Sequence, residues 1–444
     1  MSKNVVFFAD GTGNDRAHGV KTNVAKLCDL AINMLVHRGG KTWQELEGAA
    51  LDQELAKPGV EQITHYDAGI GTGMTGRVKA WLSSATGSGI SQNIQDGYDF
   101  LVRFYEPGDR IFLFGFSRGA YTVRSLGGLV GLCGIPKRLQ PAGADLRHDE
   151  ARRREIVEEA YKIYRTGAVK ENATAAEKAA GKEERLKAGK AFRKEKAYPE
   201  HKDPSARAPY FIGVWDTVRS LGIPAGGKNL EIELWPHRFH DHELNQYVSY
   251  AFHAVAIDDR REAFHPTLWN EPTKAQLTAA EIGDPPSQVF EQVWFPGVHC
   301  DVGGGYEECG LSDATLEWMI DNSQRPEHPL LLVDNPKAGL KPLVNAKIHD
   351  SRDALWKKLL YREEVRAVRR GRQEPMQTRI IPDANPHPDL HYSWVSVIET
   401  LYDGYNPVHM RDHPDYEAAV KQLGAKLRPL PGPWTCVRGR PNGE

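Results

Sequence analysis

Three side chains of this sequence could together carry out nucleophilic catalysis. Ser117 stands at the centre of a G-x-S-x-G pentapeptide, Asp216 ends the run FIGVWD, and His299 ends the run VWFPGVH. A serine hydroxyl is a weak nucleophile, so it needs a histidine that accepts its proton and a carboxylate that orients this histidine. Serine, acid and histidine in this chain order predict acyl transfer through a serine nucleophile.

The serine motif has a sequence context that favours chemistry. Residues 111–121 read IFLFGFSRGAY, a pattern typical of a buried strand, a sharp turn and the start of a helix. A serine on such an elbow has an exposed hydroxyl, and the N–H of the next residue is free to bind an oxyanion. The pentapeptide alone is common by chance, and Ser117 could merely begin a helix. The complete strand–turn–helix pattern favours the catalytic interpretation.

Asp216 and His299 each follow an apolar run directly. The carboxyl ends of parallel strands meet at one edge of a sheet, so both side chains should lie on the same edge as Ser117. Asp216 could instead cap a turn. Asp258 and Asp259 are rival candidates for the acid, and we favour Asp216.

His299 could be a structural histidine that is hydrogen-bonded to a loop. The run DVGGG at 301–305 indicates a backbone that passes close to another group, which favours a functional role. Four other histidines are alternatives: His253, His265, His349 and His391. The last two stand in polar helix-start contexts, where capping a helix is the expected role.

The negative charge that develops in acyl transfer needs two backbone N–H donors. We expect one at Arg118, directly after the nucleophile, and the other in the loop Gly11-Thr12-Gly13. The run D-G-T that overlaps this loop also occurs in a phosphatase motif, D-x-D-G-T. Phe8 stands where that motif has its nucleophilic aspartate, which excludes the phosphatase interpretation.

No cofactor is predicted from the sequence. The glycine-rich run 69–73 lacks the full dinucleotide-binding pattern, so we interpret it as a shaped active-site loop. No cluster has convincing metal-ligand spacing. A weak Ca²⁺ candidate consists of Asp10, Asp301 and Asp313.

Short apolar runs alternate with segments of helical spacing. Strands are expected at 5–9, 62–66, 110–114, 210–215 and 289–295. Helices are expected at 22–37, 89–105, 118–132 and around 243–255. This alternation predicts an α/β fold with a mostly parallel, doubly wound sheet.

The composition divides the chain into a core and two additions. Residues 1–143 and 209–334 form the expected core, and 144–208 are rich in Lys, Arg and Glu. We interpret 144–208 as a charged helical insertion, either a solvated excursion or a lid or docking surface. Residues 335–444 should form a C-terminal helical extension on the core, with helices at 351–370 and 393–402.

Overall composition excludes several classes of protein. A formal net charge of -2 argues against a nucleic-acid-binding protein. The five cysteines include no C-x-x-C pair, and their odd number does not suggest a disulfide framework, so we expect synthesis in a reducing cytoplasm. We expect no signal peptide, because the apolar run at 5–9 is too short. No stretch approaches the ~20 apolar residues of a membrane-spanning helix.

Several separated motifs carry a family resemblance. They are FADGTGN at 8–14, GFSRGAY at 115–121, GVWDTV at 213–218 and WFPGVHCDVGGGY at 294–306. The chain up to about residue 320 resembles the DUF2235 family of α/β-hydrolases, which includes the type VI secretion phospholipase effectors of the Tle1 group. The resemblance implies an α/β-hydrolase-like fold and ester hydrolysis, with Ser117 as nucleophile, His299 as base and Asp216 as acid. Cys300 departs from the family pattern, which has a serine beside the histidine.

We therefore expect a serine hydrolase that cleaves phospholipid or related lipid acyl esters. A soluble small-molecule esterase or amidase, or a non-catalytic interaction protein with the same fold, is the alternative. The resemblance implies a lipid or small ester substrate, peripheral membrane contact, and a secretion-apparatus or immunity protein as partner. It also implies secretion by a route that is independent of a signal peptide. The chain looks too short for the membrane-anchoring region of the larger effectors.

Overall fold

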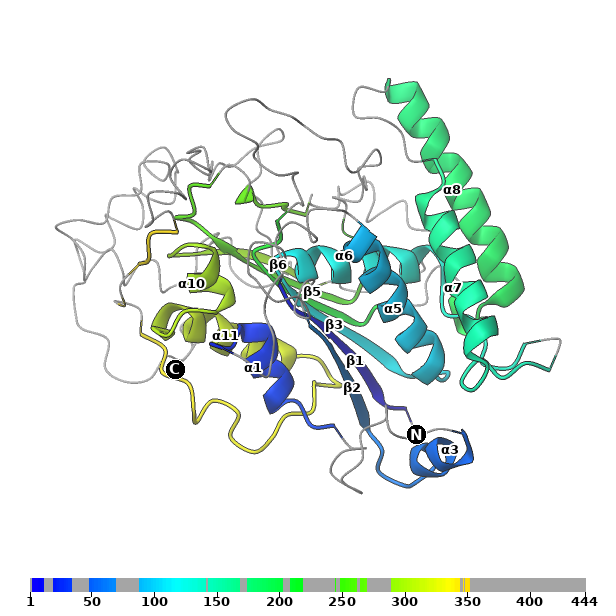
Figure 1. The fold of residues 1–444 in the computed structure, drawn as a ribbon, viewed down its shortest axis with the longest axis horizontal. Helices are drawn as coiled ribbons and strands as arrows, with labels where there is room; N and C mark the ends of the chain where they lie inside the picture. Colours follow the sequence, from blue (N-terminus) through cyan, green and yellow to red (C-terminus); the bar gives the residue numbers. More distant parts are fainter. Residues whose placement is uncertain are drawn as a thin grey trace, which may run out of the picture.

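The core of the protein is a parallel β-sheet (Figure 1). The computed structural model describes residues 2–11, 19–33, 48–68, 88–140, 143–167, 174–202, 208–218, 244, 248–261, 264–269, 289–343, 346 and 348–351. Within these ranges, six strands lie in the order β2-β1-β3-β4-β5-β6, and every neighbouring pair is parallel. The strands are β1 (Asn4–Ala9), β2 (Gln62–Asp67), β3 (Arg110–Phe116), β4 (Phe211–Trp215), β5 (Tyr250–Ala256) and β6 (Val289–Phe295).

The strands are buried because both faces of the sheet are covered. Alternate residues of β1 point to opposite faces, so Phe7 and Phe8 belong to two different apolar clusters. Phe8 stacks on Phe114 of β3 with ring centroids 5.3 Å apart. A parallel sheet that is covered on both faces requires near-continuous apolar strands, which is why these runs stand out in the sequence.

Helices cover both faces, so the doubly wound α/β prediction is confirmed. On one face lie α5 (Ser88–Phe104) and α6 (Arg118–Cys133), and on the other lie α1 (Asn23–Leu30) and α11 (Gly310–Ser323) (Figure 1). The short helix α10 (His299–Gly303) contacts β5 and α11, and α3 (Gly48–Leu55) contributes Leu51 to the first cluster.

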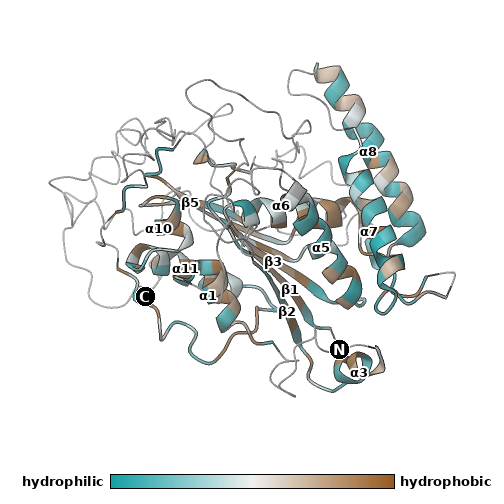
Figure 2. Cartoon of the chain, viewed as in Figure 1, coloured by the Kyte–Doolittle hydropathy of each residue, from teal (hydrophilic) through white to brown (hydrophobic). Residues whose placement is uncertain are grey.

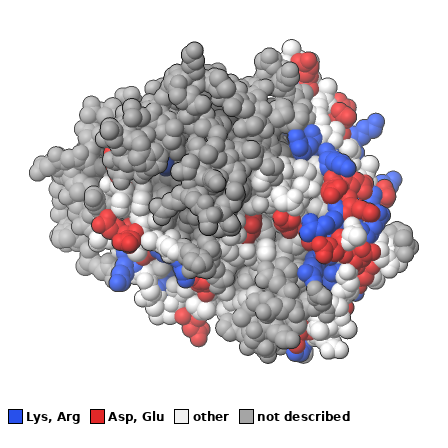
Figure 3. Space-filling view, in the orientation of Figure 1, with Lys and Arg blue, Asp and Glu red and all other residues white. Residues whose placement is uncertain are grey.

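The charged segment 144–208 contains α7 (Glu150–Arg165), α8 (Ala175–Lys196) and the 3-10 helix η2 (Pro199–Lys202). At the right of Figure 1, α7 packs against α5 and α6, and α8 packs against α6 and α7. Arg153 of α7 donates to Asp99 of α5 at 2.8 Å, which anchors this pair of helices. Hydrophilic residues predominate along both helices (Figure 2), and acidic and basic side chains are interspersed on this side of the molecule (Figure 3).

Two sequence predictions of helices need correction. Residues 250–256 are strand β5 rather than part of a helix at 243–255. This strand lies between β4 and β6 and is buried on both faces, and such a strand shows the same short apolar run as a buried helix segment. The helix expected at 22–37 ends at Leu30, because Ala31 is extended and forms a bridge with Leu332. The helices expected at 351–370 and 393–402 lie outside the described residues, apart from Ser351.

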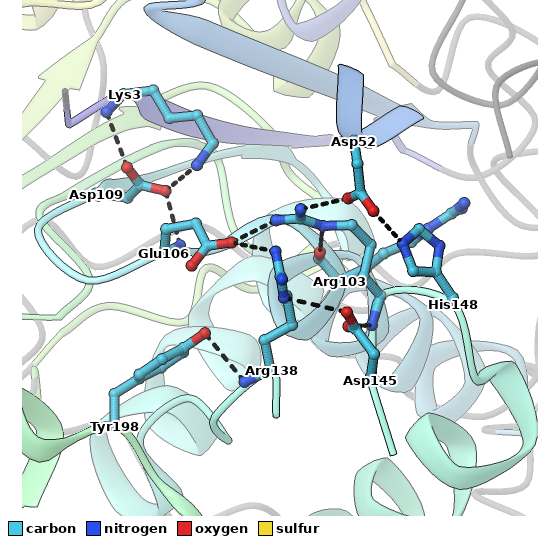
Figure 4. A network of polar contacts seen from close by, with 10 residues as sticks. Lys3, Asp52, Arg103, Glu106, Asp109, Arg138, Asp145, His148 and Tyr198 are labelled. Atoms are coloured by element: carbon cyan, nitrogen blue, oxygen red, sulfur yellow. Dashed lines mark hydrogen bonds and ion pairs between the residues drawn. The ribbon is translucent and has the colours of Figure 1, made fainter. Parts of the chain in front are cut away.

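A network of ion pairs lies near the amino ends of β1 and β3 (Figure 4). Asp109, just before β3, accepts hydrogen bonds from the main-chain N–H of Lys3 at 2.9 Å and from the Lys3 ammonium. Nearby, the buried Arg147 guanidinium donates to Asp52 at 2.8 Å and also pairs with Glu106. These contacts join segments that are far apart in the sequence.

Candidate active site

Ser117 lies in a strained turn between β3 and α6. Its φ of 58° and ψ of −121° fall outside the regions that a serine normally occupies. The glycines on each side permit a close approach of backbones: a Cβ on Gly119 would lie 2.1 Å from the Ala9 oxygen, and one on Gly115 would lie 2.5 Å from the Gly119 oxygen. This geometry is that of a nucleophile elbow.

Ser117, His299 and Asp216 form a hydrogen-bonded chain. His299 Nδ1 lies 2.6 Å from Asp216 Oδ2, and His299 Nε2 lies 2.8 Å from Ser117 Oγ. The carboxylate assigns the imidazole proton to Nδ1, so Nε2 accepts the hydrogen bond from the serine hydroxyl. The three residues come from segments up to 182 positions apart, and the sheet brings them together.

The main chain of β5 holds Asp216 in place. Asp216 follows β4 with a positive φ of 34°, and its side chain is fully buried. Its N–H donates to the oxygen of Ala254 at 2.7 Å, and its Oδ1 accepts from the N–H of Ala256 at 3.0 Å. One carboxylate oxygen is thus held by the sheet, and the other accepts from His299.

His299 begins α10 and is buried between aromatic rings. Its ring centroid lies 4.5 Å from that of Phe116 and 5.0 Å from that of Phe264. Burial lowers the pKa of His299 from its ordinary value of 6.5, and the contact with Asp216 opposes this shift without reversing it. The imidazole is therefore neutral at neutral pH, which is the state that a general base requires.

The two rival aspartates contact main-chain groups near the histidine. Asp258 accepts from the N–H of Gly297 at 2.7 Å, and Asp259 accepts from the N–H of His299 at 3.2 Å. Asp259 also forms a two-pronged ion pair with Arg261. The carboxylate at the imidazole Nδ1 is that of Asp216.

The alternative histidines have other surroundings. His253 Nε2 accepts from the N–H of Thr217 at 3.2 Å, so this fully buried histidine supports the turn after Asp216. His349 Nδ1 lies 2.6 Å from Asp301, its Nε2 lies 2.9 Å from Glu308, and its ring stacks on that of Tyr306. His349 therefore ties a C-terminal segment to α10. His391 lies outside the described residues.

The expected oxyanion donors lie on two segments. Arg118 is the first residue of α6, so its N–H lies at the positive end of a helix. The N–H of Gly11 donates to Asp10 Oδ1 at 2.6 Å, while Asp10 Oδ2 accepts from Thr22 and Tyr66, each at 2.6 Å. Thr12, Gly13 and the run 69–73 lie outside the described residues.

The carboxylates of the weak Ca²⁺ candidate have separate partners. Asp10 binds Thr22, Asp301 binds His349, and Asp313 pairs with Lys26 at 2.7 Å. Across the described ranges, no group of His, Cys, Asp and Glu side chains could hold a metal ion.

Cys300 and Asp67 are two further titratable groups near these segments. Burial raises the pKa of the Cys300 thiol to about 12, so the thiol stays protonated beside the histidine. At the end of β2, burial, together with nearby Asp96 and Asp10, raises the pKa of Asp67 to about 7.

Fold and site together define an α/β-hydrolase-like protein. A family model described as the catalytic domain of Tle1-like type VI secretion phospholipase effectors matches residues 3–322. The match covers well over half of the chain, so the chain belongs to this family, and the predicted resemblance to the Tle1 group is confirmed.

Other comparisons give more distant likenesses. The uncharacterized protein YEL023C of Saccharomyces cerevisiae is 26% identical over 274 residues, which are 59% of this chain and 32% of that protein. The match thus spans about a third of this relative. A crystal structure of an uncharacterized Pseudomonas aeruginosa protein has a TM-score of 0.37 at 15% identity, covering 76% of this chain and 47% of that chain. A structure of the Tle1 effector bound to the VgrG spike has a TM-score of 0.31 at 15% identity, covering 69% and 52%.

In the part of the chain that the structure describes, every helix is too short or too polar to span a membrane.

Proposed function

We propose that this protein is a serine ester hydrolase that acts on phospholipid or related lipid acyl esters. The observation that carries the proposal is the buried hydrogen-bonded chain from Ser117 through His299 to Asp216. Family membership supports the lipid ester as substrate, because the matched model is that of phospholipase effectors.

The proposed chemistry uses this chain of contacts. Ser117 Oγ attacks the acyl carbon while His299 Nε2 takes the hydroxyl proton, and Asp216 stabilises the imidazolium that forms. The N–H of Arg118 and a donor of the loop 11–13 stabilise the oxyanion. His299 then gives its proton to the leaving alcohol, which leaves an acyl-enzyme on Ser117. Water releases the acid by the same steps in reverse order.

Family membership supports a further proposal about the partners and the export route. We propose that the protein leaves the cell that makes it without a signal peptide, through contact with a type VI secretion apparatus, and that an immunity protein protects the producing cell. The Tle1 effector of the solved structure is bound to the VgrG spike, and a spike protein is the first partner to test. Peripheral contact with the membrane would bring the site to its substrate.

A substrate panel tests the proposed activity. Wild type and Ser117→Ala are assayed on phospholipid vesicles, on short acyl esters and on matching amides, with Ca²⁺ and with chelator. Release of fatty acid from vesicles by wild type alone is the expected result. Turnover of short esters only would favour the small-molecule esterase. Equal rates for wild type and Ser117→Ala on every substrate would overturn the proposal.

A further inference from the structure

Asp259 holds the main chain of His299 from the segment that follows β5. Its side chain is fully buried, and its Oδ2 accepts from the N–H of His299 at 3.2 Å. Its Oδ1 accepts from the main-chain N–H and from Nε of Arg261, both at 3.0 Å, and Arg261 Nη2 donates to Oδ2 at 2.7 Å. The Arg261 guanidinium compensates the buried negative charge of Asp259.

Arg261 links this carboxylate to the histidine ring through Phe264. The guanidinium carbon lies 3.4 Å from the centroid of the Phe264 ring. That ring meets the imidazole of His299 edge to face, with centroids 5.0 Å apart and planes at 76°. Asp259, Arg261 and Phe264, here termed the histidine clamp, thus contact both the backbone and the ring of His299.

The position of His299 needs such support. It is the first residue of α10, a helix of five residues, which offers few hydrogen bonds of its own. Ser117 and Asp216 contact the two ring nitrogens, and these contacts alone leave the ring free to tilt about the line that joins them. A catalytic group must be held within roughly 0.5 Å of its productive position by packing around it.

We propose that Asp259, Arg261 and Phe264 are positioning residues that hold the imidazole of His299 in line between Ser117 and Asp216. This inference rests on the proposed function of the same site. It requires an arginine at position 261, because lysine cannot make the two-pronged contact with Asp259 and stack on the Phe264 ring at once.

Arg261→Lys and Phe264→Leu, singly and together, test the clamp by kinetics. Each single variant should lower kcat by up to about 100-fold with little change in KM, because the substrate still binds while the base is misplaced. The double variant should lose little more than either single variant, since both act through one ring. Unchanged kcat in both single variants, or losses that multiply in the double variant, would overturn the inference.

A matched control exists between helices α5 and α7. Arg153 of α7 pairs with Asp99 of α5 at 2.8 Å, and its side chain is 6% exposed, against 13% for Arg261. Arg153→Lys should lower the melting temperature and leave kcat at the wild-type value. If Arg153→Lys lowers kcat as far as Arg261→Lys does, the loss reports on general stability, and the clamp inference fails.

A spectroscopic readout works without any substrate. In protein with ¹⁵N-labelled histidine, the Nδ1–H of His299 should give a far-downfield proton resonance, because it is hydrogen-bonded to a buried carboxylate. Phe264→Leu should broaden or shift this resonance, and Arg153→Lys should leave it unchanged. An unchanged resonance in both clamp variants would contradict the inference.

The two proposals can fail separately. If Ser117→Ala turns over ester as fast as wild type, the proposed function fails, while the resonance still tests the clamp. If Ser117→Ala is inactive and both clamp variants turn over at the wild-type rate, the clamp alone fails.

Discussion

The two ends of the parallel sheet hold polar side chains in different ways. Near the amino ends, Lys3 and Asp109 pair in a network of opposite charges (Figure 4). At the carboxyl ends, Ser117 and Asp216 follow their strands with positive φ values of 58° and 34°. These are two of the three non-glycine residues with positive φ among the residues described. Backbone strain at the carboxyl ends is thus combined with the hydrogen-bonded chain of Ser117, His299 and Asp216.

This difference separates two uses of buried carboxylates. Asp109 accepts from the N–H groups of Lys3 and Glu106 and from an ammonium, so its contacts join segments and stabilise the fold. Asp216 divides its oxygens between the sheet and a histidine that can take up a proton. The number of charges at a site is therefore a weaker sign of chemistry than strain and burial at the ends of strands. The same substitution at each end should have different effects.

The largest expected effect is that of Ser117→Ala at the carboxyl end. It should lower kcat on the order of a million-fold, because the nucleophile is lost. The melting temperature should change little, since the elbow stays in place. Steady-state ester hydrolysis and thermal unfolding measure the two quantities. A large fall in melting temperature would mean that Ser117 is structural.

Asp216→Asn should lower kcat by about 10,000-fold, because the imidazole loses the carboxylate that fixes its tautomer. The fold should persist, since an amide has nearly the same shape. Asp259→Asn is the comparison at the same end, and kinetics on both variants decide between the two acids. If the loss with Asp259→Asn equals or exceeds that with Asp216→Asn, the assignment of the acid is wrong.

Asp109→Asn makes the same change at the amino end. It leaves the buried Lys3 ammonium without its counter-charge, so the free energy of unfolding should fall by about 3 kcal/mol. The kcat of the folded variant should equal that of wild type. Denaturant titration and kinetics at a temperature below the transition test both statements. A loss of kcat in fully folded Asp109→Asn would mean that the two ends are coupled.

The smallest expected effect is a displaced acid limb in the pH profile. His299 accepts a proton only when it is neutral, and burial lowers its pKa below 6.5. As pH falls, kcat/KM should therefore hold below pH 6.5 and drop only when the pH passes the lowered pKa. Burial raises the pKa of Asp67 to about 7, so Asp67→Asn is the control. If the acid limb moves in Asp67→Asn, the limb reports the titration of Asp67 and not that of His299. This result would contradict the prediction.

The sequence predicts the fold well where a strand has a continuous apolar run and is followed by a turn. The strand before Ser117 and the one before Asp216 satisfy this condition. β5 is not predicted, because Tyr250–Ala256 is a short apolar run that periodicity alone does not distinguish from a buried helix segment. The end of α1 depends on a distant partner, because Ala31 forms a bridge with Leu332. The local sequence gives no sign of such an end.

The sequence predicts the candidate site residues from their motifs and chain order. It does not predict the residues that position them. Arg261 and Phe264 act through the histidine, and their contacts arise from tertiary packing. Residues 258–261 read DDRR. This run indicates rival candidates for the acid rather than residues that position His299. His349 illustrates the same limit, since its contact with Asp301 joins segments 48 residues apart.

Labelling of the intact protein with a fluorophosphonate tests the central claim most directly. The reagent forms a bond only with a serine that an adjacent base activates. We predict one adduct per chain, located on Ser117 by peptide mass spectrometry and absent from His299→Ala. An unlabelled wild type beside a labelled control hydrolase, or an adduct on another residue, would contradict the account.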